Sequence, residues 1–356
     1  MKKSVHSLTV LATLCACGFA NAQSTQSNVQ VYGLIDAGVE HVTNAGPGGG
    51  GVTRVISGGK NTSRWGFKGS EDLGGGLKAV FGLEGGILLD TGAADGALFK
   101  RQAYVGLDGK FGRVVIGRSF TSVYDFVIKF DPMGFAPNYS WATSGSATGP
   151  SKYGMTTAFD NLIKYSGQSG NLSYGATIGL GEQSNSSADG RKVAMAASWF
   201  ANGFGVMGAW EQINGNTVAA TGNRDQTSAF HVGADYKTGP WRATAGARAY
   251  KLESNRPTTP DVRGDTYWGG LSYVVDNVTL TGAVYHVNVK NVAANTDADP
   301  TMVVARTLYA LSKRTDLYLA AAHVRGQHGQ LVGLSRDDAG FGTTQSGVTA
   351  GIQHRF

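Results

Sequence analysis

The sequence predicts an all-β protein: a transmembrane antiparallel up-and-down β-barrel of about 16 strands, with a long third loop folded into the lumen. Three observations support this prediction. The N-terminus has the pattern of an export signal, and no later apolar run is long enough for a membrane-spanning helix. Apolar and polar residues alternate with a period of two. Long and short connections between these segments also alternate, as they do in bacterial barrels.

The N-terminus has the three parts of a secretory signal peptide. A basic start (MKK) precedes an apolar run over residues 8–19, and Ala-Asn-Ala then predicts cleavage after Ala22. We therefore assign residues 1–22 to the signal and residues 23–356 to the barrel domain. Cys15 and Cys17 both lie in the signal, so the mature chain is expected to hold no disulfide or thiol site. A lipoprotein signal that ends at Cys17 is the alternative interpretation.

Composition leaves two classes of exported protein. Loss of Lys2 and Lys3 with the signal lowers the formal charge from +6 to +4, which is too small and too scattered an excess to indicate nucleic-acid binding. Only 16% of the residues are charged, and Gly accounts for 53 of 356 positions. These values are typical of either a secreted β-protein or an outer-membrane barrel.

Period-two alternation favours the barrel, because lipid-facing strands carry thin apolar faces while a soluble sandwich packs large branched side chains into one core. Three segments show such faces, many of whose members are Ala. The faces expected to point toward lipid are Phe230, Val232, Ala234 and Tyr236; Trp241, Ala243, Ala245, Ala247 and Ala249; and Tyr318, Ala320, Ala322 and Val324. The opposite faces carry polar groups such as His231, Arg248 and His323.

The connections follow their own alternation. The predicted long loops are residues 43–60, 87–97, 119–160, 182–190, 214–225, 253–263, 291–300 and 326–344. The predicted tight turns between them are residues 71–76, 108–112, 167–171, 201–203, 237–240, 276–277 and 313–316. An up-and-down barrel with every long loop at one end produces this order, and it requires about 16 strands.

The chain ends on an alternating segment that closes with an aromatic residue, Phe356. Val348, Ile352 and Phe356 share one face of this segment, and Gln353 lies on the other. We expect the first strand to pair with this last one, because an unpaired strand edge is not tolerated in lipid.

Residues 119–160 interrupt the regular pattern for about 40 residues, far beyond ordinary connection lengths. The segment is rich in aromatic side chains that need a packing partner, while Asp125, Lys129, Asp131 and Asp160 need water. A loop that folds inside a water-filled, strand-built wall meets both needs. A small inserted subdomain or a surface excursion is the alternative.

Several motifs together resemble the trimeric general porins of Gram-negative bacteria, in particular the beta-proteobacterial branch. The motifs are VQVYGLID at 29–36, SRWGFKGSEDLGGGLK at 63–78, RQAYVGL at 101–107, FGRVVIGR at 111–118, NLIKY at 161–165, LSKRT at 311–315 and the terminal Phe356. The resemblance implies a 16-stranded barrel, a homotrimer, and a third loop that narrows the pore. It also implies that Phe356 acts as an assembly signal.

The resemblance further implies a constriction in which loop acids face a ladder of basic wall residues. Arg64 and Arg101 stand where the family's motifs place wall arginines, and Lys68 and Arg118 are further candidates. Either Lys164 or its neighbour Tyr165 occupies another wall position. The alternative for Arg64 is a hydrated lumen arginine with no role in selection.

Asp125 and Asp131 are the loop acids assigned to this constriction. The alternative for both is a salt bridge that holds the loop to the wall, and the two roles are compatible. The loop lacks an obvious copy of the acid-rich tip that many relatives carry.

The expected function is passive transport of ions and small hydrophilic solutes across the outer membrane, with weak anion selectivity. The expected partners are a homotrimer, outer-membrane lipid and lipopolysaccharide, and the assembly machinery, with no nucleic acid. We find no motif for a catalytic, cofactor or metal site. Two alternatives stay open: a substrate-selective channel lined by Tyr139 and Trp141, and an outer-membrane hydrolase built on His286 or His323.

Overall fold

The computed structural model describes residues 28–143, 153–184, 186–335 and 340–356, so the predicted signal peptide lies outside the described residues. The strands are β1 (Asn28–Val42), β2 (Val52–Ser57), β3 (Arg64–Gly74), β4 (Leu77–Gly86), β5 (Gln102–Gly109), β6 (Gly112–Phe120), β7 (Ala158–Ser169), β8 (Leu172–Gly179), β9 (Lys192–Ala201), β10 (Phe204–Thr217), β11 (Arg224–Thr238), β12 (Trp241–Glu253), β13 (Val262–Val275), β14 (Val278–Lys290), β15 (Thr301–Ala310), β16 (Thr315–Arg325) and β17 (Thr344–Arg355). A helix, α1 (Ser122–Val127), and a 3-10 turn, η1 (Ile128–Phe130), follow β6. No helix in the described ranges is long and apolar enough to cross a membrane.

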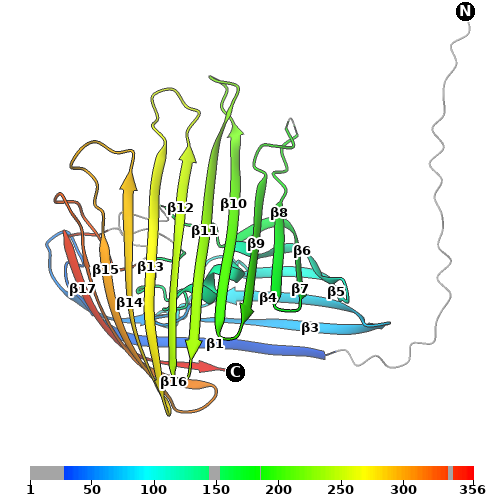
Figure 1. The fold of residues 1–356 in the computed structure, drawn as a ribbon, viewed down its shortest axis with the longest axis horizontal. Helices are drawn as coiled ribbons and strands as arrows, with labels where there is room; N and C mark the ends of the chain where they lie inside the picture. Colours follow the sequence, from blue (N-terminus) through cyan, green and yellow to red (C-terminus); the bar gives the residue numbers. More distant parts are fainter. Residues whose placement is uncertain (1–27, 144–152, 185, 336–339) are drawn as a thin grey trace, which may run out of the picture.

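The strands form one closed antiparallel barrel in which each strand pairs with its sequence neighbour (Figure 1). The last strand, β17, pairs with β1 from Leu34↔Arg355 to Val42↔Gly347. On its other side β1 pairs first with β3 and then with β2, so these two strands share one wall position and the barrel has 16 positions. The predicted closed up-and-down barrel is confirmed.

A strand inside the first predicted loop is a correction. Residues 43–60 are predicted to be a loop, yet β2 lies within them. The reason is the length of β1, which at 15 residues exceeds the roughly 9–11 that cross a bilayer. The C-terminal part of β1, from Ala37 to Val42, would otherwise expose an unpaired strand edge, and β2 pairs with this part.

The alternation of connections is confirmed. Tight turns join β3 to β4, β5 to β6, and so on to β15 and β16, while the remaining connections are longer. In Figure 1 the long connections lie along the upper and left edges of the barrel, and the tight turns along the lower and right edges.

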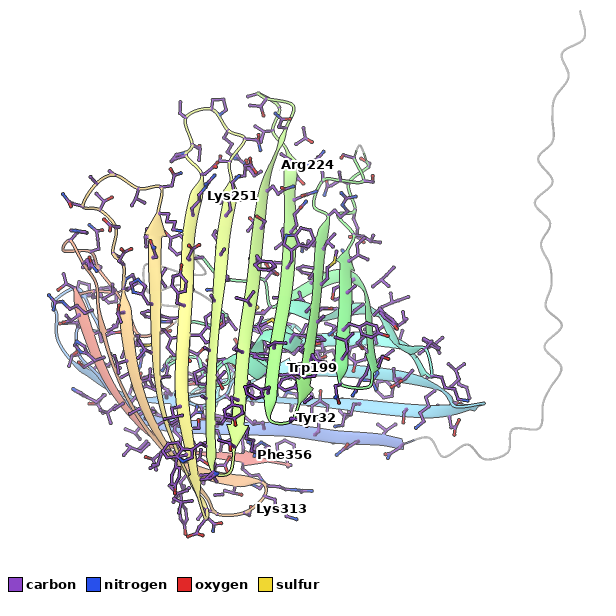
Figure 2. The ribbon with its side chains drawn as sticks, in the orientation of Figure 1. Tyr32, Trp199, Arg224, Lys251, Lys313 and Phe356 are labelled. Carbon is purple, nitrogen blue, oxygen red and sulfur yellow. The ribbon has the colours of Figure 1, made fainter. Side chains whose placement is uncertain are left out.

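The two faces of the wall differ as predicted for β11 and β12. Phe230, Val232 and Trp241 are 52%, 44% and 45% exposed on the outer face, while His231 and Arg248 are buried on the inner face. Outward aromatic residues collect near the tight turns, as a membrane-interface girdle requires. They include Trp199, seen near the lower rim in Figure 2, with Phe204, Tyr236 and Trp241.

The prediction for β16 was wrong in its direction. Tyr318, Ala320, Ala322 and Val324 face inward and are buried, whereas the outward residues include Leu317 and Leu319. Both faces of β16 are apolar, because the inner face belongs to the buried cluster that fills this side of the lumen. Alternation alone therefore could not identify the lipid side.

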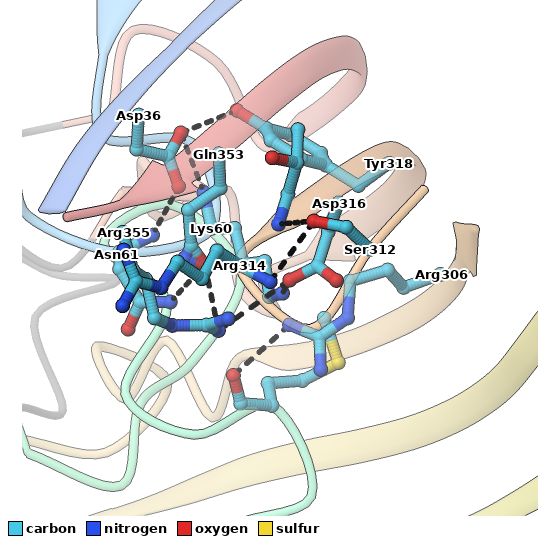
Figure 3. Close-up of polar contacts among 12 residues, drawn as sticks. Asp36, Lys60, Asn61, Arg306, Ser312, Arg314, Asp316, Tyr318, Gln353 and Arg355 are labelled. Atoms are coloured by element: carbon cyan, nitrogen blue, oxygen red, sulfur yellow. Dashed lines mark hydrogen bonds and ion pairs between the residues drawn. The ribbon is translucent and has the colours of Figure 1, made fainter. Parts of the chain in front are cut away.

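A polar network locks the seam between the first and last strands (Figure 3). The buried Asp36 carboxylate accepts from the Tyr318 hydroxyl at 2.7 Å and from the backbone N–H of Asn61 at 2.8 Å. The Lys60 ammonium donates to Asp316 at 2.6 Å, and the Asn61 amide donates to Gln353 at 3.1 Å. These bonds hold the short segment 58–63 against the inner wall, and this segment leads directly into β3.

The chain end is fastened to the same seam. Phe356 and Gly33 exchange two backbone hydrogen bonds of 3.1 Å each. The Phe356 ring lies over Gly33, where a Cβ atom would approach it to 2.3 Å. Glycine at position 33 thus makes room for the terminal aromatic ring.

The segment after β6 turns inward, as predicted, and its backbone is bonded to the wall. Helix α1 is capped by Thr121, whose hydroxyl accepts from the Tyr124 N–H at 3.1 Å. Beyond it, wall side chains donate to loop carbonyl groups. Trp268 donates to the Phe130 carbonyl at 2.7 Å, and Arg306 donates to the Met133 carbonyl at 3.1 Å.

Arg248 is the most buried of these donors. It is 1% exposed and donates to the carbonyls of both Trp141 and Ala142, and at 3.0 Å to the Thr266 hydroxyl. A buried carbonyl without a donor costs about 1–3 kcal/mol, so such bonds fix the path of the inward segment.

We predict that Phe356→Asp strongly lowers the amount of assembled barrel in the outer membrane. The substitution removes the ring from Gly33 and places a charge at the lipid-facing chain end. The matched control is Gly48→Asp, because a Cβ at Gly48 meets no atom within 4 Å. Quantitative immunoblots of outer-membrane fractions test this prediction. Equal levels of both variants would show that Phe356 is not needed for assembly.

We predict that Arg248→Met loosens the inward segment. Two buried carbonyl groups lose their donor, at a cost of about 1–3 kcal/mol each. In planar bilayers the variant should show noisier open-channel current and more frequent closures than the native protein. Lys251→Met on the outer face of the same strand is the control. Unchanged noise in Arg248→Met would show that other contacts suffice to hold the segment.

Candidate functional site

The inward segment and the wall enclose a cavity of about 760 Å³ in the lumen. Its lining comes from the start of β3, from β4, from residues at the start of β5, from β10 to β12, and from the inward segment. The charged side chains among the described lining residues are Arg64, Glu84 and Arg101. The structure thus brings together two of the four predicted basic residues.

Arg64 is positioned by the segment that the seam network holds. It is the first residue of β3, and its Nη1 donates to the Thr62 carbonyl at 3.0 Å. Its Nε lies 3.7 Å from Glu84 Oε2. The side chain keeps 28% of its surface exposed, so it is open to the cavity.

Arg101 lies directly before β5 and is held from two sides. Its Nε donates to Glu84 Oε1 at 2.7 Å. Its guanidinium carbon lies 5.1 Å from the centre of the Phe120 ring, within cation–π distance.

Glu84 is a charged cavity-lining residue that the sequence analysis did not identify. It is 3% exposed on β4, and its second oxygen accepts from the Tyr32 hydroxyl at 2.9 Å. One carboxylate therefore links β1, β3 and the start of β5. The alternation of faces along β4 could have placed Glu84 on the inner face. In the structure it pairs with Gln102 of β5 and with Gly66 of β3.

Lys68 and Arg118 do not line this cavity. Lys68 lies over the Tyr32 ring at 4.8 Å and borders a separate hollow of about 210 Å³. Arg118 donates to the Lys100 carbonyl and forms an ion pair with Asp160. Both belong to strands of the wall outside the cavity lining.

Asp125 pairs with Lys164 at the base of the inward segment. The Lys164 ammonium also donates to the Phe120 carbonyl at 3.0 Å, so Lys164 points inward and ties the segment to β7. Tyr165 instead donates to the Phe111 carbonyl at 2.7 Å. The choice between these two neighbours is thereby decided in favour of Lys164.

Asp131 is buried within the inward segment rather than open to the cavity. Its carboxylate accepts from the backbone N–H groups of Met133 and Phe135 at 3.2 and 2.6 Å. It also accepts from the Ser140 hydroxyl at 2.7 Å and from the wall residue Tyr285 at 2.5 Å. Four donors explain how a carboxylate that is 3% exposed is accommodated.

The aromatic residues of the selective-channel alternative are also buried. Tyr139 and Trp141 are 1% and 0% exposed, and Trp141 donates to the Leu334 carbonyl at 3.2 Å. The Tyr139 hydroxyl bonds to Thr349, and burial raises the pKa of this phenol well above its ordinary value. Neither ring is placed to guide a solute.

The histidines of the hydrolase alternative contact only hydroxyl groups by hydrogen bond among the described residues. His286 bonds to Thr301 at 2.9 Å, and His323 bonds to Ser346 at 2.8 Å. Neither has the carboxylate partner that orients a catalytic histidine.

Comparisons with known proteins agree with this geometry. A family model described as Gram-negative porin matches residues 7–329. The chain is 30% identical to outer membrane porin protein 32 of Delftia acidovorans, with 100% of both chains covered. It is 27% identical to an outer membrane porin protein of Bordetella pertussis, with 98% and 99% covered.

Among solved structures, the barrel is similar to an anion-selective porin from Comamonas acidovorans. The TM-score is 0.77 at 27% identity, and the match covers 93% of this chain and 100% of that one. With the closed barrel, the inward third loop and the charged cavity already in place, the chain belongs to the Gram-negative porin family of the outer membrane.

Proposed function

We propose that the protein is a general diffusion porin with weak anion preference, set by Arg64 and Arg101 and moderated by Glu84. The observation that carries this proposal is the charge of the cavity lining. Two guanidinium groups and one carboxylate leave one positive charge in excess where the inward segment narrows the lumen. The similarity to an anion-selective porin supports the same sign.

A single excess charge accounts for a bias that is weak rather than absolute. A unit charge about 7 Å from an ion in water contributes about 0.6 kcal/mol, or roughly threefold in local ion concentration. Salt screens this field over about 10 Å at 0.1 M, so the bias declines as salt rises.

The other predicted site residues take supporting roles in this proposal. Lys68 and Arg118 contribute to the field on the approach to the constriction. Asp125 and Asp131 hold the inward segment, the first through Lys164 and the second through Tyr285. The protein acts as a passive channel with no catalytic step.

The homotrimer also belongs to the proposal. Outward faces of β1 carry Val29, Val31 and Val39 at 63%, 57% and 55% exposure, which suits either lipid or a neighbouring barrel. A trimer form is described for the Vibrio cholerae protein OmpT, whose fold is similar at a TM-score of 0.68. Outer-membrane lipid, lipopolysaccharide and the assembly machinery are the remaining partners that we propose.

We predict that Arg101→Gln lowers the chloride-to-potassium permeability ratio by roughly sevenfold, because loss of one unit charge about 7 Å away lowers the local chloride concentration and raises the local potassium concentration by about 2.7-fold each. Arg64→Glu should move the ratio further in the same direction, and Glu84→Gln should raise it. Reversal potentials across a salt gradient at low ionic strength measure these changes.

Arg118→Gln is the matched control, because this arginine lies on the wall outside the cavity lining. Its reversal potential should change much less than that of Arg101→Gln. Equal shifts in both variants, or none in either, would contradict the assignment of the constriction.

We predict that the mature chain starts at Gln23 and migrates as a heat-modifiable trimer. Signal cleavage after Ala22 precedes barrel assembly, and small outward residues allow barrels to pack closely. N-terminal sequencing and unheated gel electrophoresis test both statements. A mature N-terminus at Cys17, or a monomer under every mild condition, would contradict them.

A further inference from the structure

Three aromatic rings, one from the end of β6 and two from the inward segment, form one side of the constriction cavity. The rings of Phe120 and Tyr124 stack with centres 4.4 Å apart and planes 15° apart. The Phe135 ring continues the group at 5.0 Å from Tyr124, with a 58° tilt. All three residues line the cavity, and Phe120 and Tyr124 are only partly buried.

The arginines at this cavity have donors that the protein does not use. Glu84 occupies Nε of Arg101, and no group among the described residues accepts from the two terminal nitrogens of Arg101. Arg64 uses Nη1 for the Thr62 carbonyl. Glu84 itself is occupied by Arg101, Tyr32 and Arg64, so a cationic solute finds no free carboxylate at this site.

We propose that the constriction binds planar aromatic carboxylates in preference to other small anions. Arg101 pairs with the carboxylate through its terminal nitrogens, and the ring lies against Phe120 and Tyr124. The inference rests on the proposed function, since it takes the anion preference of the same site and adds a solute class to it.

The combination of groups accounts for this preference. A small inorganic anion gains only from the positive charge, whereas an aryl carboxylate also gains aromatic contact of about 0.5–1.5 kcal/mol. The charge-assisted pair with a guanidinium adds geometric specificity. Binding stays weak, as a channel requires, because a site that conducts must also release its solute.

Benzoate and cyclohexanecarboxylate provide the test on the native channel in planar bilayers. The two anions carry the same charge and are close in size, but only benzoate has an aromatic ring. Each is titrated against the chloride current. We expect benzoate to reach half-block at a concentration about 2- to 13-fold lower, the fold-change that corresponds to the aromatic contact. Equal half-block concentrations would overturn the inference.

Tyr124→Leu should abolish the difference between the two anions while the chloride reversal potential stays biased toward anions. Tyr309→Leu, on the outer face of β15 at 46% exposure, should leave the benzoate preference intact. A benzoate preference that survives in Tyr124→Leu would overturn the role of the aromatic face. If Tyr124→Leu does not assemble, Phe120→Leu takes its place, and the comparison on the native channel needs no variant.

The reversal potential separates this inference from the proposed function. A native channel without anion bias in chloride contradicts both. An anion-biased channel that blocks equally with both acids contradicts only the solute class.

Discussion

Every backbone polar group of the wall strands within the membrane must find a partner inside the protein, because the surrounding hydrocarbon offers none. The wall meets this constraint by closing on itself, with β17 paired to β1 along nine registered positions from Leu34 to Val42. Beyond the length that a bilayer requires, β2 covers an edge that the long first strand would otherwise leave unpaired. The same constraint explains why the terminal residue exchanges two hydrogen bonds with Gly33 instead of fraying.

The buried backbone of the inward segment also needs hydrogen-bond partners inside the protein. In its described part, regular structure is limited to the short helix α1 and the 3-10 turn η1, so many carbonyl groups there have no partner within the segment. The wall provides donors at matching places: Trp268 for Phe130, Arg306 for Met133 and Arg248 for Trp141 and Ala142. These residues are wall arginines and a tryptophan whose charge or ring faces the loop and not the solute. The positive side chains of the lumen thus divide into those that hold the segment and those that remain open to the cavity.

This division sets the limit of what could be predicted from the sequence. Alternation and turn spacing depend on the lipid boundary, which acts on every strand alike, so the barrel, its strand number and the inward segment were predictable. The roles of individual lumen residues depend on which group reaches which carbonyl across the barrel. Arg248 and Asp131 are therefore anchors, although their residue types equally suit a constriction. Glu84 was missed because a single acid in an alternating strand has no distinctive local pattern, and β16 misled because both of its faces are apolar.

Glu84 shows how a constriction can hold two like charges close together without binding anions too tightly. Unpaired, Arg64 and Arg101 would repel each other and hold a counterion strongly in the narrowed lumen. The shared carboxylate fixes both guanidinium groups and removes about half of their combined field, while the Tyr32 hydroxyl donates to its second oxygen. Because Glu84 is 3% exposed, we propose that it acts on the solute through the arginines rather than by contact. In the proposed constriction, a buried acid beside two partly exposed bases therefore favours passage over capture, and it leaves the terminal nitrogens of Arg101 next to the aromatic face.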